Sequence, residues 1–451
     1  MNDPVAAWRA LQAEVPDSAA WVESVMSAQQ AAGFVYHGKA MLEVAEPTFV
    51  TASQVAADQH AAEAVVAALV AAGRLLLDDR DLQNTYIPGW LDGVPDADLF
   101  SLPSGYTQPI VFGRLDGVRT SEGLHFLEFN GGLPGGILPA DGSADLLADT
   151  DLARAFGQQH PFRTATVGED VLDALIDTWH DFGGGGPPYT VVAMPRELTD
   201  IATPALTYLS GLAQARGLEI AIADPGDLVF RDDRLRLDGR EVDVLVRAFF
   251  TPMLAYLAER LDGIKAALRA GSLCMITSLQ SGLFGLKSLF AMVTDPAVSL
   301  GLSDEQLRLA LEHLPWTRLV ADDRSTDDQG ETVDLLAYLA ARREQLVIKP
   351  TDGYGGAGVE LGWLHNDDSW AKVIANAAAG GHVAQQRVPI VTEHFSLLRE
   401  GFPLQGFTAD HNPLLCSGKL SGYYVRLAPE GGGLTNVTGG GATVAPTFIL
   451  E

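Results

Sequence analysis

Two short polar clusters near residue 120 carry side chains that suit a divalent cation. Asp116 and Glu128 are hard carboxylate ligands, and Asn130 adds a neutral carbonyl oxygen. Magnesium takes one or two carboxylates, keeps several waters and commonly bridges to phosphate groups. Side chains alternate along a strand, so positions 128 and 130 share a face. A hairpin turning over Gly117–Gly123 would bring Asp116 to that face, which predicts a magnesium site. A surface hairpin with solvated charges is the equal alternative.

A glycine-rich segment more than two hundred residues later predicts a phosphate site. It follows an apolar run that ends in Lys349 and Pro350. A dinucleotide-binding turn would need a helix to begin at the last glycine, but residues 359–363 alternate like a strand. The glycines therefore predict the tip of an antiparallel hairpin, whose N–H groups can meet phosphate oxygens without side-chain obstruction. This favours ATP over NAD, with the candidate contacts Lys349, Gly353, Tyr354, Gly355, Gly356 and Gly358.

Three further segments offer contacts for the same nucleotide. Lys287 falls near the predicted start of a helix, where a cation is unfavourable unless an anion such as phosphate lies beside it; an exposed lysine is the alternative. Residues 384–389 read as a strand and its exit, so backbone groups near Gln386 and Val388 could pair with the adenine edge. The glycine-dense tail adds Arg426 and Asn436 as candidate phosphate or metal contacts.

The elements that would position these residues fall into three segments, and their alternation predicts an α/β fold. Residues 1–165 begin helical and rich in alanine and end with the metal-binding hairpin. Residues 166–298 carry alternating strand and helix patterns, which predict a small βαβ domain. Residues 299–451 hold the glycine loop, a helix over 367–378 and the tail.

Within the middle segment the patterns are specific enough to give element boundaries. The βαβ unit is predicted from a strand over 189–194, a helix over 203–216 and a strand over 219–223. A hairpin of 230–237 and 241–247 is then predicted to turn at Asp238-Gly239. Arg247 would end its second strand, where either a ligand-facing or a salt-bridged structural role is open.

Composition excludes several classes of protein. The chain of 451 residues has a formal net charge of −28, which disfavours nucleic acid as a partner. No apolar run reaches the eighteen residues of a membrane span, and the Ala- and Val-rich residues 61–73 predict a core helix. Two distant cysteines and the absence of a secretory pattern predict a reducing, cytoplasmic setting. Neither a G-x-S-x-G nor an H-E-x-x-H motif supports a hydrolase.

The polar clusters and their order along the chain resemble a known enzyme family. Arg114-x-Asp116 followed by Glu128-x-Asn130 is similar to the metal-binding motif of glutathionylspermidine-synthase-type enzymes, which are circularly permuted ATP-grasp ligases. In them, as here, the metal hairpin precedes the lysine and glycine-loop segments. The resemblance implies an ATP-grasp core with permuted element order and a small βαβ pre-ATP-grasp-like domain.

The chain also departs from that family. After Asn130 it reads Gly-Gly-Leu-Pro-Gly-Gly in place of an acidic, threonine-rich continuation, and these 451 residues show no sign of an attached amidase domain. This argues against glutathione and spermidine as substrates. The size and the glycine-rich ending are more similar to stand-alone peptide ligases of actinobacterial natural-product pathways, such as the pheganomycin type.

The resemblance implies ATP-dependent ligation of a carboxylate to an amine through an acylphosphate. Asp116, Glu128 and Asn130 would hold Mg²⁺, Lys287 and Lys349 would bind the phosphates, and Arg114 and Arg426 would serve catalysis. The implied partners are small-molecule or peptide acids and amines, without nucleic acid or membrane. The oligomeric state is open, with a homodimer as one option. A phosphotransferase on the same scaffold and a nucleotide-binding protein without turnover are the alternatives.

Overall fold

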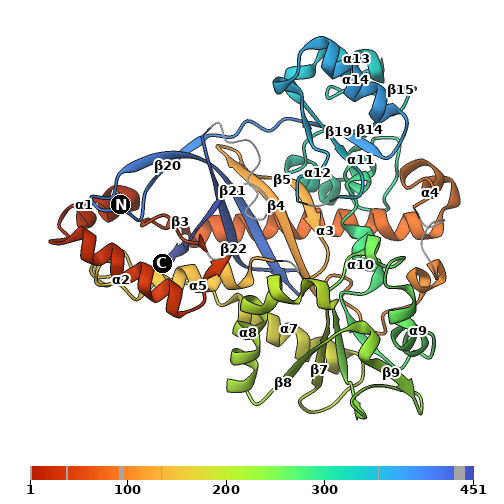
Figure 1. The fold of residues 1–451 in the computed structure, drawn as a ribbon. Helices are drawn as coiled ribbons and strands as arrows, with labels where there is room; N and C mark the ends of the chain where they lie inside the picture. The colour runs from red at the N-terminus through yellow and green to blue at the C-terminus, as the bar shows by residue number, and fades with distance from the viewer. Residues whose placement is uncertain (1–2, 37–38, 91–95, 134, 354, 431–441) are drawn as a thin grey trace.

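The computed structural model describes residues 3–36, 39–90, 96–133, 135–353, 355–430 and 442–451. It has an α/β fold whose central sheet joins strands from two distant parts of the chain (Figure 1). The strand order is β23-β22-β21-β4-β5, and β20 pairs with the start of β21. The bounds are β4 Phe112–Thr120, β5 Gly123–Asn130, β20 Thr392–Ser396, β21 Leu404–Cys416, β22 Lys419–Pro429 and β23 Thr443–Ala445.

The β4–β5 hairpin has a shorter turn than its sequence suggests. Only residues 121 and 122 lie outside the two strands, so the predicted turn over Gly117–Gly123 is wrong. Val118 and Thr120 are β-branched and continue the strand. Gly117 lies at a β-bulge, where a Cβ atom would come within 2.7 Å of the His125 carbonyl oxygen. The glycine therefore marks a bulge within the strand and not the turn.

The middle segment forms a four-stranded parallel sheet in the order β13-β12-β7-β8. It contains the predicted βαβ unit, which is confirmed with small shifts at the element ends. The bounds are β7 Tyr189–Ala193, α8 Thr199–Ala215, β8 Glu219–Ala223, β12 Val244–Arg247 and β13 Cys274–Ile276. In Figure 1 this sheet lies below the central sheet.

The hairpin predicted after β8 is partly wrong. Residues 230–237 form two strands, β9 Leu228–Arg231 and β10 Arg234–Leu237, because Asp232 and Asp233 both adopt positive φ and turn the chain. The Asp238-Gly239 turn is confirmed, but it leads only to β11 Arg240–Glu241. β12 instead joins the parallel sheet, since its four residues are all buried and suit a strand covered on both faces.

A third sheet, with the order β14-β19-β17-β18, carries the glycine loop. The loop connects two antiparallel strands, as predicted. The helix predicted over 367–378 is also confirmed, and Asn366 caps its N-terminus through the Ser369 N–H. The bounds are β14 Thr317–Leu319, β17 Leu346–Pro350, β18 Glu360–Leu361, β19 His382–Gln386, α13 Leu335–Ala341 and α14 Asp367–Ala378.

The long helix α3, Ala52–Asp78, contains the predicted core helix 61–73. It is long and apolar enough to cross a membrane, but 56% of its apolar window is buried inside the protein, as in a core helix. It packs on β22, α11 and α12.

The remaining helices are α1 Pro4–Ala13, α2 Ser18–Ala31, α4 Arg80–Tyr86, α5 Ile137–Ala148, α6 Asp151–Gly157, α7 Val167–Asp181, α9 Asp262–Arg269 and α12 Asp304–Glu312, besides α10 and α11 below. The remaining strands are β1 Val35–Tyr36, β2 Lys39–Ala40, β3 Thr48–Thr51, β6 Phe162–Arg163, β15 Arg324–Thr326, β16 Thr332–Asp334 and β24 Thr447–Leu450.

A close backbone contact fixes α10, Leu279–Phe284, against the end of β5. A Cβ atom at Gly131 would lie 2.2 Å from the Ser281 carbonyl oxygen, and one at Gly285 would lie 3.0 Å from the Phe129 carbonyl oxygen. Only glycine permits this approach. Helix α11, Lys287–Thr294, begins two residues after Gly285. The contact therefore sets the distance between Lys287 and the β4–β5 hairpin.

Gly131→Ala should destabilise the protein by ~2 kcal/mol, because the added methyl group must push α10 away from β5. Gly132→Ala is the matched control, since a Cβ atom there meets no atom within 4 Å. Urea unfolding of both variants measures the difference. Equal stabilities would contradict the proposed role of the contact.

Candidate active site

Four polar side chains share one face of the β4–β5 hairpin. The strand register places Asp116 opposite Glu128, and Arg114 opposite Asn130. The intervening Leu115 is fully buried, as the alternation of a strand requires. The hairpin thus brings together the residues that the sequence nominates as metal ligands and one of the two nominated catalytic arginines.

Asp116 is the centre of this group. Its carboxylate accepts hydrogen bonds from Arg114 Nε at 2.5 Å, Arg426 Nη2 at 2.9 Å and Asn130 Nδ2 at 3.2 Å. Burial opposes ionisation of Asp116, but the two guanidinium groups outweigh it and lower its pKa. Both arginines also lie over the Tyr424 ring, with 5.7 and 5.6 Å from the guanidinium carbons to the ring centroid. Arg426, from β22, is therefore part of the same charged cluster.

Lys287 joins the hairpin to the glycine loop. Its Nζ donates to the Gly353 carbonyl at 2.6 Å and lies 3.4 Å from Glu128 Oε1. Its backbone N–H, at the first position of α11, donates to the Thr351 carbonyl at 2.9 Å. The alternative of an exposed lysine is wrong, because Lys287 is buried. The anion beside this helix N-terminus is the carboxylate of Glu128.

Lys349 is buried in the same place. Its Nζ donates to the Leu127 carbonyl of β5 at 3.0 Å. Burial lowers the pKa of Lys349 to about 8, with Lys287 adding to the effect and with Glu128 and Asp116 opposing it. Lys349 thus lies within electrostatic reach of both carboxylates. The structure brings the early acidic hairpin and the late lysine strand together.

The glycine loop has backbone that side chains rarely adopt. Gly355, Gly356 and Gly358 all have positive φ, and a Cβ atom on Gly358 would come within 2.8 Å of Pro350 Cγ. The positive φ favours glycine at all three positions, and the close contact with Pro350 adds a second reason at Gly358. Two residues nominated from the sequence, Tyr354 and Asn436, lie outside the described residues.

The segment nominated for adenine contacts lies at the end of β19. The Gln386 N–H donates to the Trp316 carbonyl at 2.8 Å, and the Arg387 N–H donates to the Gln345 carbonyl at 2.7 Å. These two N–H groups are therefore already bonded to neighbouring backbone carbonyls. Val388 follows β19 as irregular chain.

Arg247 has neither of the two roles left open by its sequence position. Its guanidinium is buried and donates to the carbonyl of Thr277 at 2.6 Å and to that of Ser278 at 3.1 Å. Burial lowers the pKa of Arg247 to about 10. Arg247 therefore anchors the end of β13 and the start of α10.

Sequence reasoning missed two residues of the site, Asp410 and Asn412 on β21. Both are buried, and Asp410 binds Arg426, with Arg426 Nε 3.0 Å from Asp410 Oδ2. Asn412 Nδ2 donates to Asp410 Oδ1 at 3.0 Å. The available signal was the run of three polar residues, Asp410, His411 and Asn412, within a strand, where the first and third point to one face.

The donor set fits a magnesium ion that completes its shell with water and phosphate. Asp116 and Glu128 offer two facing carboxylates, and the Asn130 amide lies beside them. Across the described residues, no group of three or more His, Cys, Asp or Glu side chains could hold a metal by itself. Mg²⁺ rarely uses such an all-protein cage and is commonly bound through one or two carboxylates plus phosphate oxygens.

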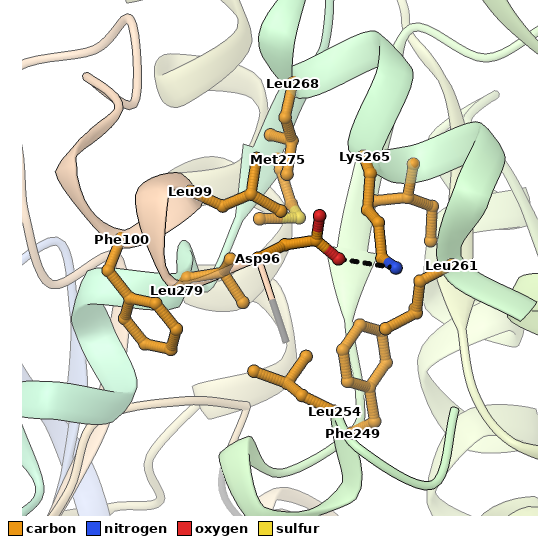
Figure 2. Close-up of a pocket in the computed structure, with 11 residues that line it drawn as sticks. Asp96, Leu99, Phe100, Phe249, Leu254, Leu261, Lys265, Leu268, Met275 and Leu279 are labelled. Carbon is orange, nitrogen blue, oxygen red and sulfur yellow. Dashed lines mark ion pairs between the residues drawn. The ribbon is translucent and has the colours of Figure 1, made fainter. Parts of the chain in front are cut away.

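A separate cavity lies inside the parallel-sheet domain (Figure 2). Its walls are apolar apart from an ion pair, in which Lys265 Nζ lies 2.7 Å from Asp96 Oδ2. Its volume is about 20 Å³, enough for about one water molecule. This cavity is a packing gap in the domain core and not a nucleotide site.

Comparison with known proteins supports the fold. A solved glutathione synthetase-like effector (GSS30) from Globodera pallida, in its apo form, superposes with a TM-score of 0.59 over 95% of this chain and 97% of its own. The chain has the ATP-grasp-type fold of a glutathione synthetase-like protein. The two sequences are only 11% identical, so the likeness concerns the fold alone.

One curated relative is similar in sequence. It is a putative glutamate–cysteine ligase 2-3 from Frankia alni, 28% identical over 260 residues. The match includes 55% of this chain but only 27% of the relative, so the chain spans about a quarter of that protein's length. No known protein-family profile matches the chain.

Lys349 should make protein stability depend on pH. Its folded pKa of about 8 lies below the ordinary value of 10.5. Between these values the unfolded chain binds more protons, so unfolding becomes harder as pH rises. The Tm of the wild type, relative to that of Lys349→Met, should therefore rise from pH 7.5 to 9.5 in scanning calorimetry. Lys372→Met, which removes an exposed ammonium from α14, should run parallel to the wild type. Parallel curves for Lys349→Met would contradict the assignment.

Proposed function

We propose that this chain is an ATP-dependent ligase that joins a carboxylate to an amine. The observation that carries the proposal is the convergence of Asp116 and Glu128 with Lys287, Lys349 and the glycine loop, through Lys287 Nζ and its contacts to Glu128 and Gly353. The fold of a glutathione synthetase-like protein and the similarity to a putative ligase support it. The proposed cofactors are ATP and Mg²⁺.

Each side chain has a role in this proposal. Asp116, Glu128 and Asn130 would hold Mg²⁺, which neutralises phosphate charge during transfer. Lys287 and Lys349 would bind the phosphates, and the N–H groups of the glycine loop would close over them. Closure matters because water would otherwise hydrolyse an activated acyl group.

The two arginines would act on the reacting groups. A substrate carboxylate oxygen attacks the γ-phosphorus of ATP and ADP leaves, and an amine then displaces phosphate to form the amide. Arg114 and Arg426 would stabilise the charge that develops in these steps. Removing one such donor from an enzyme typically costs about 3–4 kcal/mol of barrier.

The substrates are proposed only by class. The matched segment makes up 27% of the Frankia alni protein, so glutamate and cysteine are not transferred to this chain. We propose a small-molecule or peptide acid and an amine, as in peptide natural-product assembly. The formal net charge of −28 disfavours nucleic-acid partners, and the two distant cysteines support a cytoplasmic enzyme.

Crossed pairs of acids and amines should reveal the activity. Amino acids and short peptides are offered in both roles with ATP and Mg²⁺, and ADP release is measured beside product mass. A ligase releases ADP only when an amine is present, and the product mass corresponds to an amide. ADP release that needs no amine, with a phosphorylated product, would instead identify a phosphotransferase. Failure of every pair to release ADP would leave only nucleotide binding.

Glu128→Gln should lower the rate of ADP release at least a hundredfold, because the amide loses the charge that holds the cation while keeping the side-chain shape. Glu122→Gln is the matched control, since it changes an exposed glutamate in the turn of the same hairpin. Unchanged Tm values would show that both variants fold. Wild-type rates for Glu128→Gln at ordinary Mg²⁺ concentration would remove the metal assignment.

A further inference from the structure

We propose that Asp410 and Asn412 form a positioning pair that holds Arg426 in place when Asp116 turns to a metal ion. This inference rests on the proposed function, because it assigns Asp116 to Mg²⁺. Neither residue is proposed as a ligand of the ion. Their part is to keep the charges around Asp116 balanced in both states.

The pair is built into two strands of the central sheet. Asp410 of β21 lies opposite Arg426 of β22, and Asn412 lies opposite Tyr424. Asp410 accepts from Arg426 twice over, through the guanidinium and through the backbone N–H at 3.2 Å. Asp410 is also buried, so its charge depends on these partners.

Asn412 extends the pair to the metal hairpin. It is fully buried, and its Nδ2 donates to Asp410 Oδ1 at 3.0 Å and to the Tyr424 carbonyl at 2.8 Å. Its Oδ1 accepts the Gly117 N–H at 3.0 Å, at the bulge next to Asp116. The bonds therefore form a closed ring, from Asp116 to Arg426, Asp410, Asn412 and back to the neighbour of Asp116.

The ring gives Arg426 two carboxylates to share. Arg426 Nη2 lies 2.9 Å from Asp116 Oδ2 and also binds Asp410. When Asp116 gives its oxygen to a cation, a partly buried guanidinium with a single carboxylate partner would lose its pairing, which is costly. Asp410 removes that cost because it keeps its own bond to Arg426. The metal ion then displaces the contact of Arg426 with Asp116, while the contact of Arg426 with Asp410 remains.

Asp410→Asn tests this directly. The variant keeps the side-chain shape but leaves Asp116 as the one carboxylate that pairs with Arg426 among the described residues, so cation binding must compete with the full ion pair. Free Mn²⁺, a probe for Mg²⁺, is measured by its electron paramagnetic resonance in the presence of ADP. The Kd for Mn²⁺ should rise at least tenfold. Asp322→Asn, at an exposed loop position, is the control and should match the wild type.

A double variant separates positioning from simple structural support. Asp410→Asn with Arg426→Met removes both the partner and the competing guanidinium, so its Kd for Mn²⁺ should return to within threefold of the wild type. It also removes the Arg426 guanidinium, which Asp410→Asn would leave with Asp116 as its carboxylate partner, so it keeps the test available if Asp410→Asn does not fold. Asp410→Glu should recover part of the affinity.

Two outcomes would overturn the inference. One is a folded Asp410→Asn protein with wild-type affinity for Mn²⁺, and the other is a double variant that binds Mn²⁺ as weakly as the single variant. In either case, amine-dependent ADP release by the wild type would leave the proposed function standing. A wild-type protein that neither binds Mn²⁺ nor releases ADP would instead reject the proposed function.

Discussion

The partly buried carboxylate of Asp116 is the constraint on which the site depends. A charge in this position is tolerated only if paired and hydrogen-bonded, and here Arg114 and Arg426 supply the pairing from two different strands. Those strands must therefore lie in one sheet, although Arg426 comes from the last part of the chain. The order β22-β21-β4-β5 meets this requirement. The pairing of Asp116 with two arginines thus depends on the order of the strands in the central sheet.

The close backbone contact at Gly131 is a second constraint on the site, and it is steric. The contact between Gly131 and Ser281 lets α10 approach β5 without intervening side chains. That approach brings the start of α11, and with it Lys287, to Glu128. Lys287 in turn binds the Gly353 carbonyl, so the glycine loop is tied to the hairpin. Close packing at one point therefore links the central sheet, through α10 and α11, to the sheet that carries the glycine loop.

The sequence predicted the elements of the fold better than the contacts between them. Helix 367–378 and the βαβ unit follow from local periodicity and capping, which a single segment contains. Gly117 misled because a glycine in a strand can mark either a turn or a bulge, and only its pairing with Phe126 on the neighbouring strand decides. β12 was assigned to a hairpin because its choice between two sheets depends on burial by distant elements.

The site residues show the same boundary. Asp116, Glu128 and Lys349 were identifiable because their residue types and neighbours carry chemistry. Asp410 was not, since its proposed role depends on lying opposite Arg426, and the register between two strands cannot be read from either strand alone. The hydrogen-bond partners of the two N–H groups at Gln386 and Arg387 could not be predicted either, because the acceptors, the carbonyls of Trp316 and Gln345, come from other elements.

The charges of the cluster also support the proposed phosphate ligand, although the chain as a whole is strongly acidic. The cluster contains four cationic side chains, Arg114, Lys287, Lys349 and Arg426, and three carboxylates, Asp116, Glu128 and Asp410. With Lys349 protonated, the local balance is positive, although the formal net charge of the chain is −28. Burial strengthens this local field relative to the screened charges of the surface. A phosphate group would also stabilise the Lys349 ammonium, whose pKa burial has lowered. The same desolvation that weakens the lysine in the ligand-free protein therefore makes it a better partner for phosphate.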